Sequence, residues 1–123
     1  MQIIYPRKAL NKAYLKQKIN RDALELFRSN MIKMLENSKA KESEEYHKNL
    51  LNTFLSDTYY KETNFINTLE RTDLVIHDEA TANSNAAVLI ETKKPGNKPE
   101  MPSKHNINTK ALRELLRYYL RER

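Results

Sequence analysis

Residues 88–96 read V-L-I-E-T-K-K-P-G, an apolar run that ends in Glu91, one spacer residue and Lys93. The apolar part predicts a β-strand over residues 86–93. Side chains alternate between the two faces of a strand, so Glu91 and Lys93 share one face. A carboxylate and an ammonium at the end of a buried strand indicate either a surface ion pair or a functional site. Features elsewhere in the sequence are needed to decide between a surface ion pair and a functional site.

The bulk composition restricts the class of protein. The chain has 123 residues, which suits one domain or a fragment of a longer chain, and its formal net charge of +6 favours an anionic partner. It has no cysteine, which excludes disulfides and thiolate metal sites and is typical of a reducing compartment. It shows neither an apolar signal region nor a window of transmembrane length. We therefore expect a cytoplasmic protein that does not span a membrane.

The order of the predicted elements is helices, strands and a final helix. Apolar steps of three and four residues predict one helix after the candidate N-cap Asn20 and another after Ser43, whose first turn is acidic. Strands are predicted over residues 64–68 and 71–77, before the strand at 86–93. The predicted fold class is therefore α/β (α+β), with N-terminal helices, an antiparallel β-meander of two to three strands and a C-terminal helix.

The final helix is expected to begin after an N-cap at Asn106 or Asn108. Its inner face is predicted from apolar spacing to carry Leu112, Leu115, Leu116 and Tyr119.

A second carboxylate is expected beside Glu91 and Lys93. If the strands at 71–77 and 86–93 pair through the polar turn between them, Asp73 lies on their common face. Two converging carboxylates repel each other, and oxygen ligands suit a hard cation such as Mg²⁺ or Mn²⁺. A lysine beside such an ion would orient or deprotonate water and stabilise charge on a phosphate. We expect His77, at the end of its strand, to lie in solvent.

These residues resemble a known signature. Asp73, seventeen intervening residues and then Glu91-Thr92-Lys93 are similar to the D…(D/E)-x-K pattern of the PD-(D/E)XK nuclease superfamily. The longer phrases resemble the N-terminal nuclease region of type IIG-like, single-chain restriction–modification enzymes. Those phrases are F-L-S-D-T-Y-Y (54–60), T-D-L-V-I-H (72–77) and N-T-K-A-L-R-E-L-L-R-Y-Y-L-R-E (108–122).

The resemblance implies a restriction-endonuclease-like core of a helix, a three-stranded meander, a helix and a fourth strand. Residues 1–42 would form an N-terminal helical region, and residues 43–123 a nuclease core that is truncated before its fourth strand, as in a fragment of a longer chain. Thr72 stands where the family usually has proline. Double-stranded DNA is the implied partner, with methyltransferase and target-recognition regions on the same parent chain, and a homodimer is compatible with this.

The resemblance also assigns roles by position. Asp73 and Glu91 would be ligands of Mg²⁺ (or Mn²⁺), the Thr92 carbonyl a third ligand, and Lys93 the catalytic lysine. The family often adds a glutamate from the helix before the meander. Glu44 and Glu45 are both candidates, and Glu45 is preferred as the catalytic residue. Glu114 and Tyr118 occupy a region where related nucleases place a polar helix residue near the active site.

Basic residues predict the contacts with DNA phosphates, although a solvated helix face would show the same pattern. They are Lys94 in the loop after the last strand and, on the final helix, Lys110, Arg113, Arg117 and Arg121.

The function predicted from these features is a Mg²⁺-dependent DNA endonuclease domain that hydrolyses phosphodiester bonds. The alternative is a non-catalytic DNA- or protein-binding module on a degenerate nuclease scaffold. A helical assembly domain with incidental hairpin charges is a third interpretation.

Overall fold

The computed structural model describes residues 4–69 and 72–121, and it confirms a mixed fold of helices and a three-stranded antiparallel sheet. The elements are α1 (Pro6–Ala9), α2 (Lys12–Lys16), α3 (Arg21–Asn37), α4 (Glu44–Leu55), the π-helix η1 (Ser56–Tyr60), β1 (Ile66–Leu69), β2 (Thr72–His77), β3 (Ala86–Ile90), the 3₁₀-helix η2 (Lys98–Glu100) and α5 (Lys110–Arg121). Within the described ranges, no helix has the length and apolar content needed to cross a membrane.

The strands form a meander in the order β1-β2-β3, so β2 is the central strand. Leu74 pairs with Ile90 and Val75 with Leu89. Leu74 and Val75 point to opposite faces, yet both are almost completely buried, because elements cover both faces of β2. β3 ends at Ile90, earlier than the predicted strand end, so Glu91 to Lys93 lie in the segment that follows the strand.

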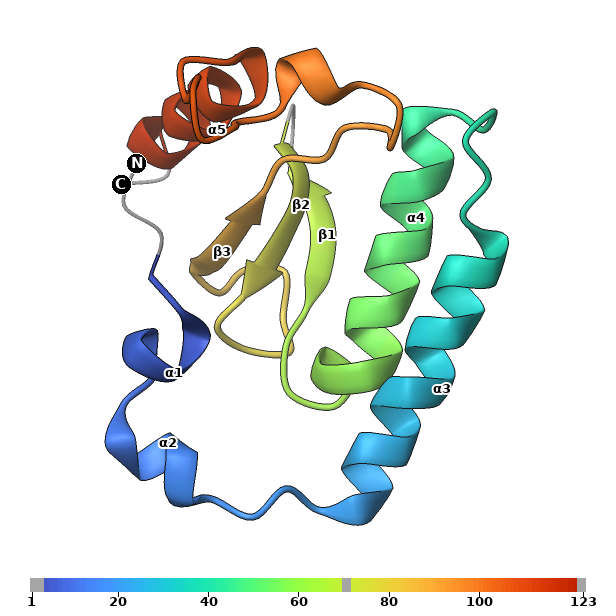
Figure 1. Cartoon of the computed structure of the whole chain (residues 1–123), viewed down its shortest axis with the longest axis vertical. Helices are drawn as coiled ribbons and strands as arrows, with labels where there is room; N and C mark the ends of the chain where they lie inside the picture. Colours follow the sequence, from blue (N-terminus) through green and yellow to red (C-terminus); the bar gives the residue numbers. More distant parts are fainter. Residues whose placement is uncertain (1–3, 70–71, 122–123) are drawn as a thin grey trace.

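Two helices build a layer on the sheet. α4 packs against β2, and α3 lies on the outer side of α4 (Figure 1). Phe54 of α4 is buried. Its ring packs edge-on against that of Phe27, with the two ring centres 5.9 Å apart. Both helices begin at the predicted caps: the side chain of Asn20 accepts from Asp22 N, and the Ser43 hydroxyl accepts from the backbone of α4.

The final helix α5 differs from the prediction in its start and in its buried face. It begins at Lys110, and the carbonyl of Thr109 accepts the first helical hydrogen bond, so neither Asn106 nor Asn108 is the cap. Ala111 and Tyr118 are its buried residues. Two residues predicted to face inward are about half exposed: Leu116 at 50% and Tyr119 at 47%.

His77 was expected in solvent, and this prediction is wrong. Its side chain is only 4% exposed. Nδ1 lies 2.8 Å from the carbonyl of Ser84, and Nε2 lies 3.1 Å from Oδ1 of Asn67 on β1. The imidazole therefore joins β1 to the turn between β2 and β3, and it lies at the end of β2 away from Asp73.

The buried central strand gives a stability prediction. Leu74→Ala removes a side chain that is 1% exposed, so the free energy of unfolding should fall by about 2–5 kcal/mol through lost apolar burial and a cavity. Val88→Ala, at a side chain that is 44% exposed, serves as the control and should cost less than about 1 kcal/mol. Urea unfolding measures both. Equal losses in the two variants would contradict a core centred on β2.

Candidate active site

Asp73 of β2 is held against the segment that follows β3. Both the backbone N–H and the hydroxyl of Thr92 donate to Asp73 Oδ2, each at 2.7 Å. The pairing of Leu74 with Ile90 brings the start of β2 next to the end of β3. The structure therefore brings Asp73 to the Glu91–Lys93 segment.

The side chain of Lys93 lies at the centre of the site and is only 5% exposed. Its Nζ contacts Glu91 Oε1, lies 3.3 Å from Glu114 Oε2 on α5, and lies 3.6 Å from Glu44 Oε1 on α4. Burial alone would lower the pKa of Lys93, but the hydrogen bond and charge of Glu91, with Glu114 and Glu44, raise it. Lys93 is therefore an ammonium, suited to binding a phosphate oxygen rather than to removing a proton.

Glu91 is the buried carboxyl group of the site, with a side chain that is 6% exposed. Burial raises its pKa, the hydrogen bond from Lys93 opposes that shift, and the charge of Asp73 adds to it, which brings the pKa to about 7. Its Oε2 is buried and forms no hydrogen bond. Near neutral pH, Glu91 is thus divided between its acid and its carboxylate.

Glu114 reaches the site from α5, although the sequence indicated it only loosely. Burial would raise its pKa, but hydrogen bonding with Glu91 and with Lys93 outweighs this and lowers it. The two carboxyl groups influence each other, and their pKa values move in opposite directions: that of Glu91 is raised and that of Glu114 is lowered. Tyr118, one turn further along α5, is buried, and its pKa is raised by burial and by the charges of Glu91 and Glu114.

Of the two candidate glutamates on α4, Glu44 is the one near Lys93. Its Oε2 also accepts a hydrogen bond from the backbone of Lys94, at 3.3 Å. Glu45 pairs with Lys48 at 2.5 Å, and its side chain is 64% exposed. Successive helical residues point about 100° apart, so only one of the two can face the sheet. The geometry therefore favours Glu44 over Glu45 as the site residue.

The predicted DNA-contacting residues Lys94, Lys110, Arg113, Arg117 and Arg121 are all exposed. Two of them already have neighbours in the protein. Lys110 Nζ lies 3.6 Å from Glu100, and the Arg121 guanidinium lies 5.8 Å from the centre of the Tyr118 ring. Contact of this group with phosphates stays a prediction.

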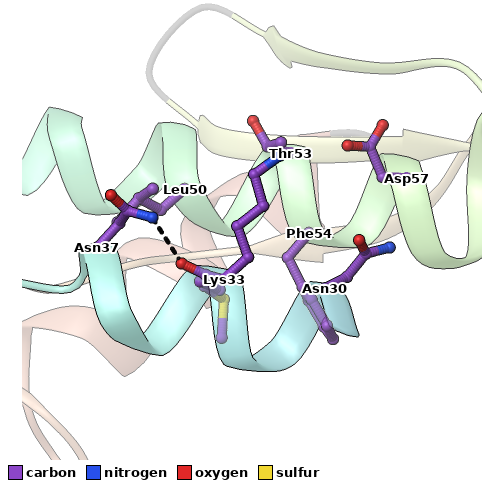
Figure 2. A pocket seen from close by; sticks show the side chains of 8 residues that line it. Asn30, Lys33, Asn37, Leu50, Thr53, Phe54 and Asp57 are labelled. Carbon is purple, nitrogen blue, oxygen red and sulfur yellow. Dashed lines mark hydrogen bonds between the residues drawn. The ribbon is translucent and has the colours of Figure 1, made fainter. Parts of the chain in front are cut away.

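Two of the cavities along the α3–α4 layer are relevant to the site. One of about 300 Å³ opens beside the site, where Glu91, Thr92 and Lys93 form part of a wall that is otherwise largely apolar. The other lies between α3 and α4 (Figure 2) and measures about 50 Å³. The second holds at most a few waters and is too small for a nucleotide. Only the first could admit a substrate group to the site.

The carboxylate atoms at the site are oxygen ligands, the type that a hard divalent cation prefers. Asp73 and Glu91 provide the carboxylates, and Glu91 Oε2 has no hydrogen bond. Among residues 4–69 and 72–121, no group of three or more His, Cys, Asp and Glu side chains is arranged to hold a metal ion. Mg²⁺ commonly uses one or two carboxylates and keeps several waters, so two carboxylates are within its range.

Comparison with known proteins gives one match. The model of the family described as Domain of unknown function (DUF7149) matches residues 4–123. No curated protein and no solved structure matches the chain. The matched range includes each of the site residues described above.

The raised pKa of Glu91 predicts how stability depends on pH. Between pH 4.5, the ordinary value, and about 7, the folded chain holds a proton that the unfolded chain has released. The free energy of unfolding should therefore fall as the pH rises through this range, by up to about 1.4 kcal/mol per pH unit for one proton. Glu91→Gln should reduce that slope, and urea unfolding at several pH values without divalent ions measures it.

Glu45→Gln is the matched control for this titration, because that side chain is largely exposed and pairs only at the surface. It should retain the slope of the wild-type chain. A Glu91→Gln variant with an undiminished slope would show that another group titrates.

Proposed function

We propose that this chain, which belongs to the DUF7149 family of domains of unknown function, carries the active site of a Mg²⁺-dependent DNA endonuclease. The observation that supports it best is the meeting of Asp73, Glu91 and Lys93 at the ends of two neighbouring strands. The pattern of these residues resembles the PD-(D/E)XK signature, and the restriction-endonuclease-like core is proposed with it. The substrate would be double-stranded DNA.

Each residue of the site would have its own role. Asp73, fixed by the two Thr92 donors, and Glu91 would hold Mg²⁺ or Mn²⁺ together with the Thr92 carbonyl. The bound ion would supply Lewis-acid stabilisation of charge on the phosphate. The Lys93 ammonium would bind a non-bridging phosphate oxygen and stabilise its developing negative charge. Glu44 and Glu114 would keep Lys93 charged and in position.

The resemblance extends the proposal to a biological setting. It places the chain in a type II, IIG-like restriction–modification enzyme whose parent chain carries methyltransferase and target-recognition regions. The described residues suggest no module for reading base edges, so sequence specificity would come from those regions.

A non-catalytic module is the second candidate, and one observation favours it. Lys93 is already surrounded by three carboxylates, as in a buried ion cluster that serves the fold. On this interpretation the cluster joins α4, α5 and the end of β3, and the chain binds DNA or protein without cutting. The endonuclease requires a bound divalent ion, whereas the non-catalytic module does not.

Cleavage of DNA tests the roles of the site residues. In the full-length protein, Asp73→Ala, Glu91→Ala and Lys93→Ala should each reduce Mg²⁺-dependent cleavage of plasmid DNA by at least about 100-fold, because each removes a group that stabilises the transition state. DNA binding measured in EDTA should persist.

The two α4 glutamates provide a matched pair for this assay. Glu44→Gln should lower cleavage because it removes a carboxylate 3.6 Å from Lys93, whereas Glu45→Gln should leave it unchanged. Wild-type cutting by the Lys93→Ala variant would overturn the endonuclease proposal.

Metal binding separates the two candidate functions directly. Calorimetric titration with Mn²⁺ should show one site in the wild-type chain, and Asp73→Ala should abolish it because the ion loses one of two carboxylates. The isosteric Asp73→Asn variant guards against loss through misfolding. The absence of any heat of binding in the folded wild-type chain would favour the non-catalytic module.

A further inference from the structure

The positive charge of this chain is concentrated in one short segment. Residues 4–20, called the basic arm below, contain five of the 22 basic residues and none of the 16 acidic residues. The remainder therefore has 17 basic and 16 acidic residues, a net charge of only +1. The five are Arg7, Lys8, Lys12, Lys16 and Lys18.

The basic arm is fully open to solvent. From residue 4 to residue 20, with Pro6 aside, each side chain is exposed. The arm includes α1 and α2, which stand apart from the sheet in the view of Figure 1. No carboxylate of residues 4–69 or 72–121 forms an ion pair with any of its five cations. The cations are thus available to an external anion.

The composition of the arm favours a nucleic acid over a membrane surface. Its helices have four and five residues, too few to present the continuous apolar face that holds an amphipathic helix in a bilayer. Tyr5 and Tyr14, at 71% and 67% exposed, lie between the cations. Lysine, arginine and tyrosine side chains are common donors to DNA phosphates and sugars.

We propose that the basic arm binds the phosphate backbone of duplex DNA. The arm would provide most of the electrostatic attraction, since the rest of the chain is nearly neutral. This inference shares its partner with the proposed function but not its site, because no residue of the arm belongs to the Asp73–Glu91–Lys93 site. It therefore holds whether or not that site cleaves DNA.

The salt dependence of binding is the property to measure. Each phosphate contact displaces condensed counterions and contributes about 0.9 to the slope of log K against log salt. The triple variant Lys12→Gln, Lys16→Gln, Lys18→Gln should therefore reduce the slope of log K against log salt by up to about 2.7. It should also weaken DNA binding at least about tenfold at moderate salt. Fluorescence anisotropy with a short labelled duplex, in EDTA so that no cleavage occurs, measures both.

The matched control removes the same charge elsewhere. Arg28→Gln, Lys33→Gln, Lys61→Gln alters three exposed cations outside the arm and should leave the slope within about one of the wild-type value. Equal slopes for the two triple variants would overturn the proposal. So would arm-dependent binding to phosphatidylserine vesicles without binding to DNA, or arm-dependent self-association in sedimentation without binding to DNA.

The same experiment separates this inference from the proposed function. If the wild type binds through the arm but does not cut DNA with Mg²⁺ or Mn²⁺, the endonuclease proposal fails and the arm proposal stands. If the wild type cuts DNA but the arm variants bind it normally, the arm proposal fails and the endonuclease proposal stands.

Discussion

The burial of one ammonium group sets the arrangement around the end of β3. Lys93 has almost no exposed surface, and taking such a charge out of water costs several kcal/mol unless counter-charges surround it. Glu91 comes from the same segment, Glu44 from the first turn of α4 and Glu114 from the second turn of α5. Two helices far apart in sequence are thereby fixed around one residue.

This requirement explains the rotation of α5. Apolar spacing predicts a buried face made of Leu112, Leu115, Leu116 and Tyr119. The helix instead presents Glu114 and Tyr118 to the site. Leu116 and Tyr119 are left half exposed beside β3, where they line an apolar groove together with Ala86 to Leu89. Satisfying a buried charge therefore outweighed complete burial of two apolar side chains, as the relative free energies would lead one to expect.

The sequence predicts features that depend on neighbouring residues, but not features that depend on contacts between distant residues. The helix caps at Asn20 and Ser43 depend on neighbouring residues and were predictable. The meeting of Asp73 with the segment after β3 follows from strand alternation in a hairpin. The choice between Glu44 and Glu45 depends on the rotation of α4 about its axis, and the burial of His77 depends on a carbonyl seven residues away and on Asn67 of β1. Neither the choice of Glu44 nor the burial of His77 can be predicted from the pattern of neighbouring residues.

Hydrogen bonds do not satisfy every buried polar atom of the cluster. A cluster that served stability alone would be expected to satisfy its polar atoms, because a buried acceptor without a donor costs about 1–3 kcal/mol. Here Glu91 Oε2 is buried without a hydrogen bond, whereas the buried Glu114 Oε2 has the Lys93 ammonium at 3.3 Å, and the pKa of Glu91 is about 7. Three carboxylates surround the Lys93 ammonium, and Asp73 lies beside them against Thr92, which leaves an excess of negative charge that a cation would neutralise. Such an excess would repel a phosphate on its own, so a DNA substrate would need both the cation at the site and positive charge elsewhere on the chain.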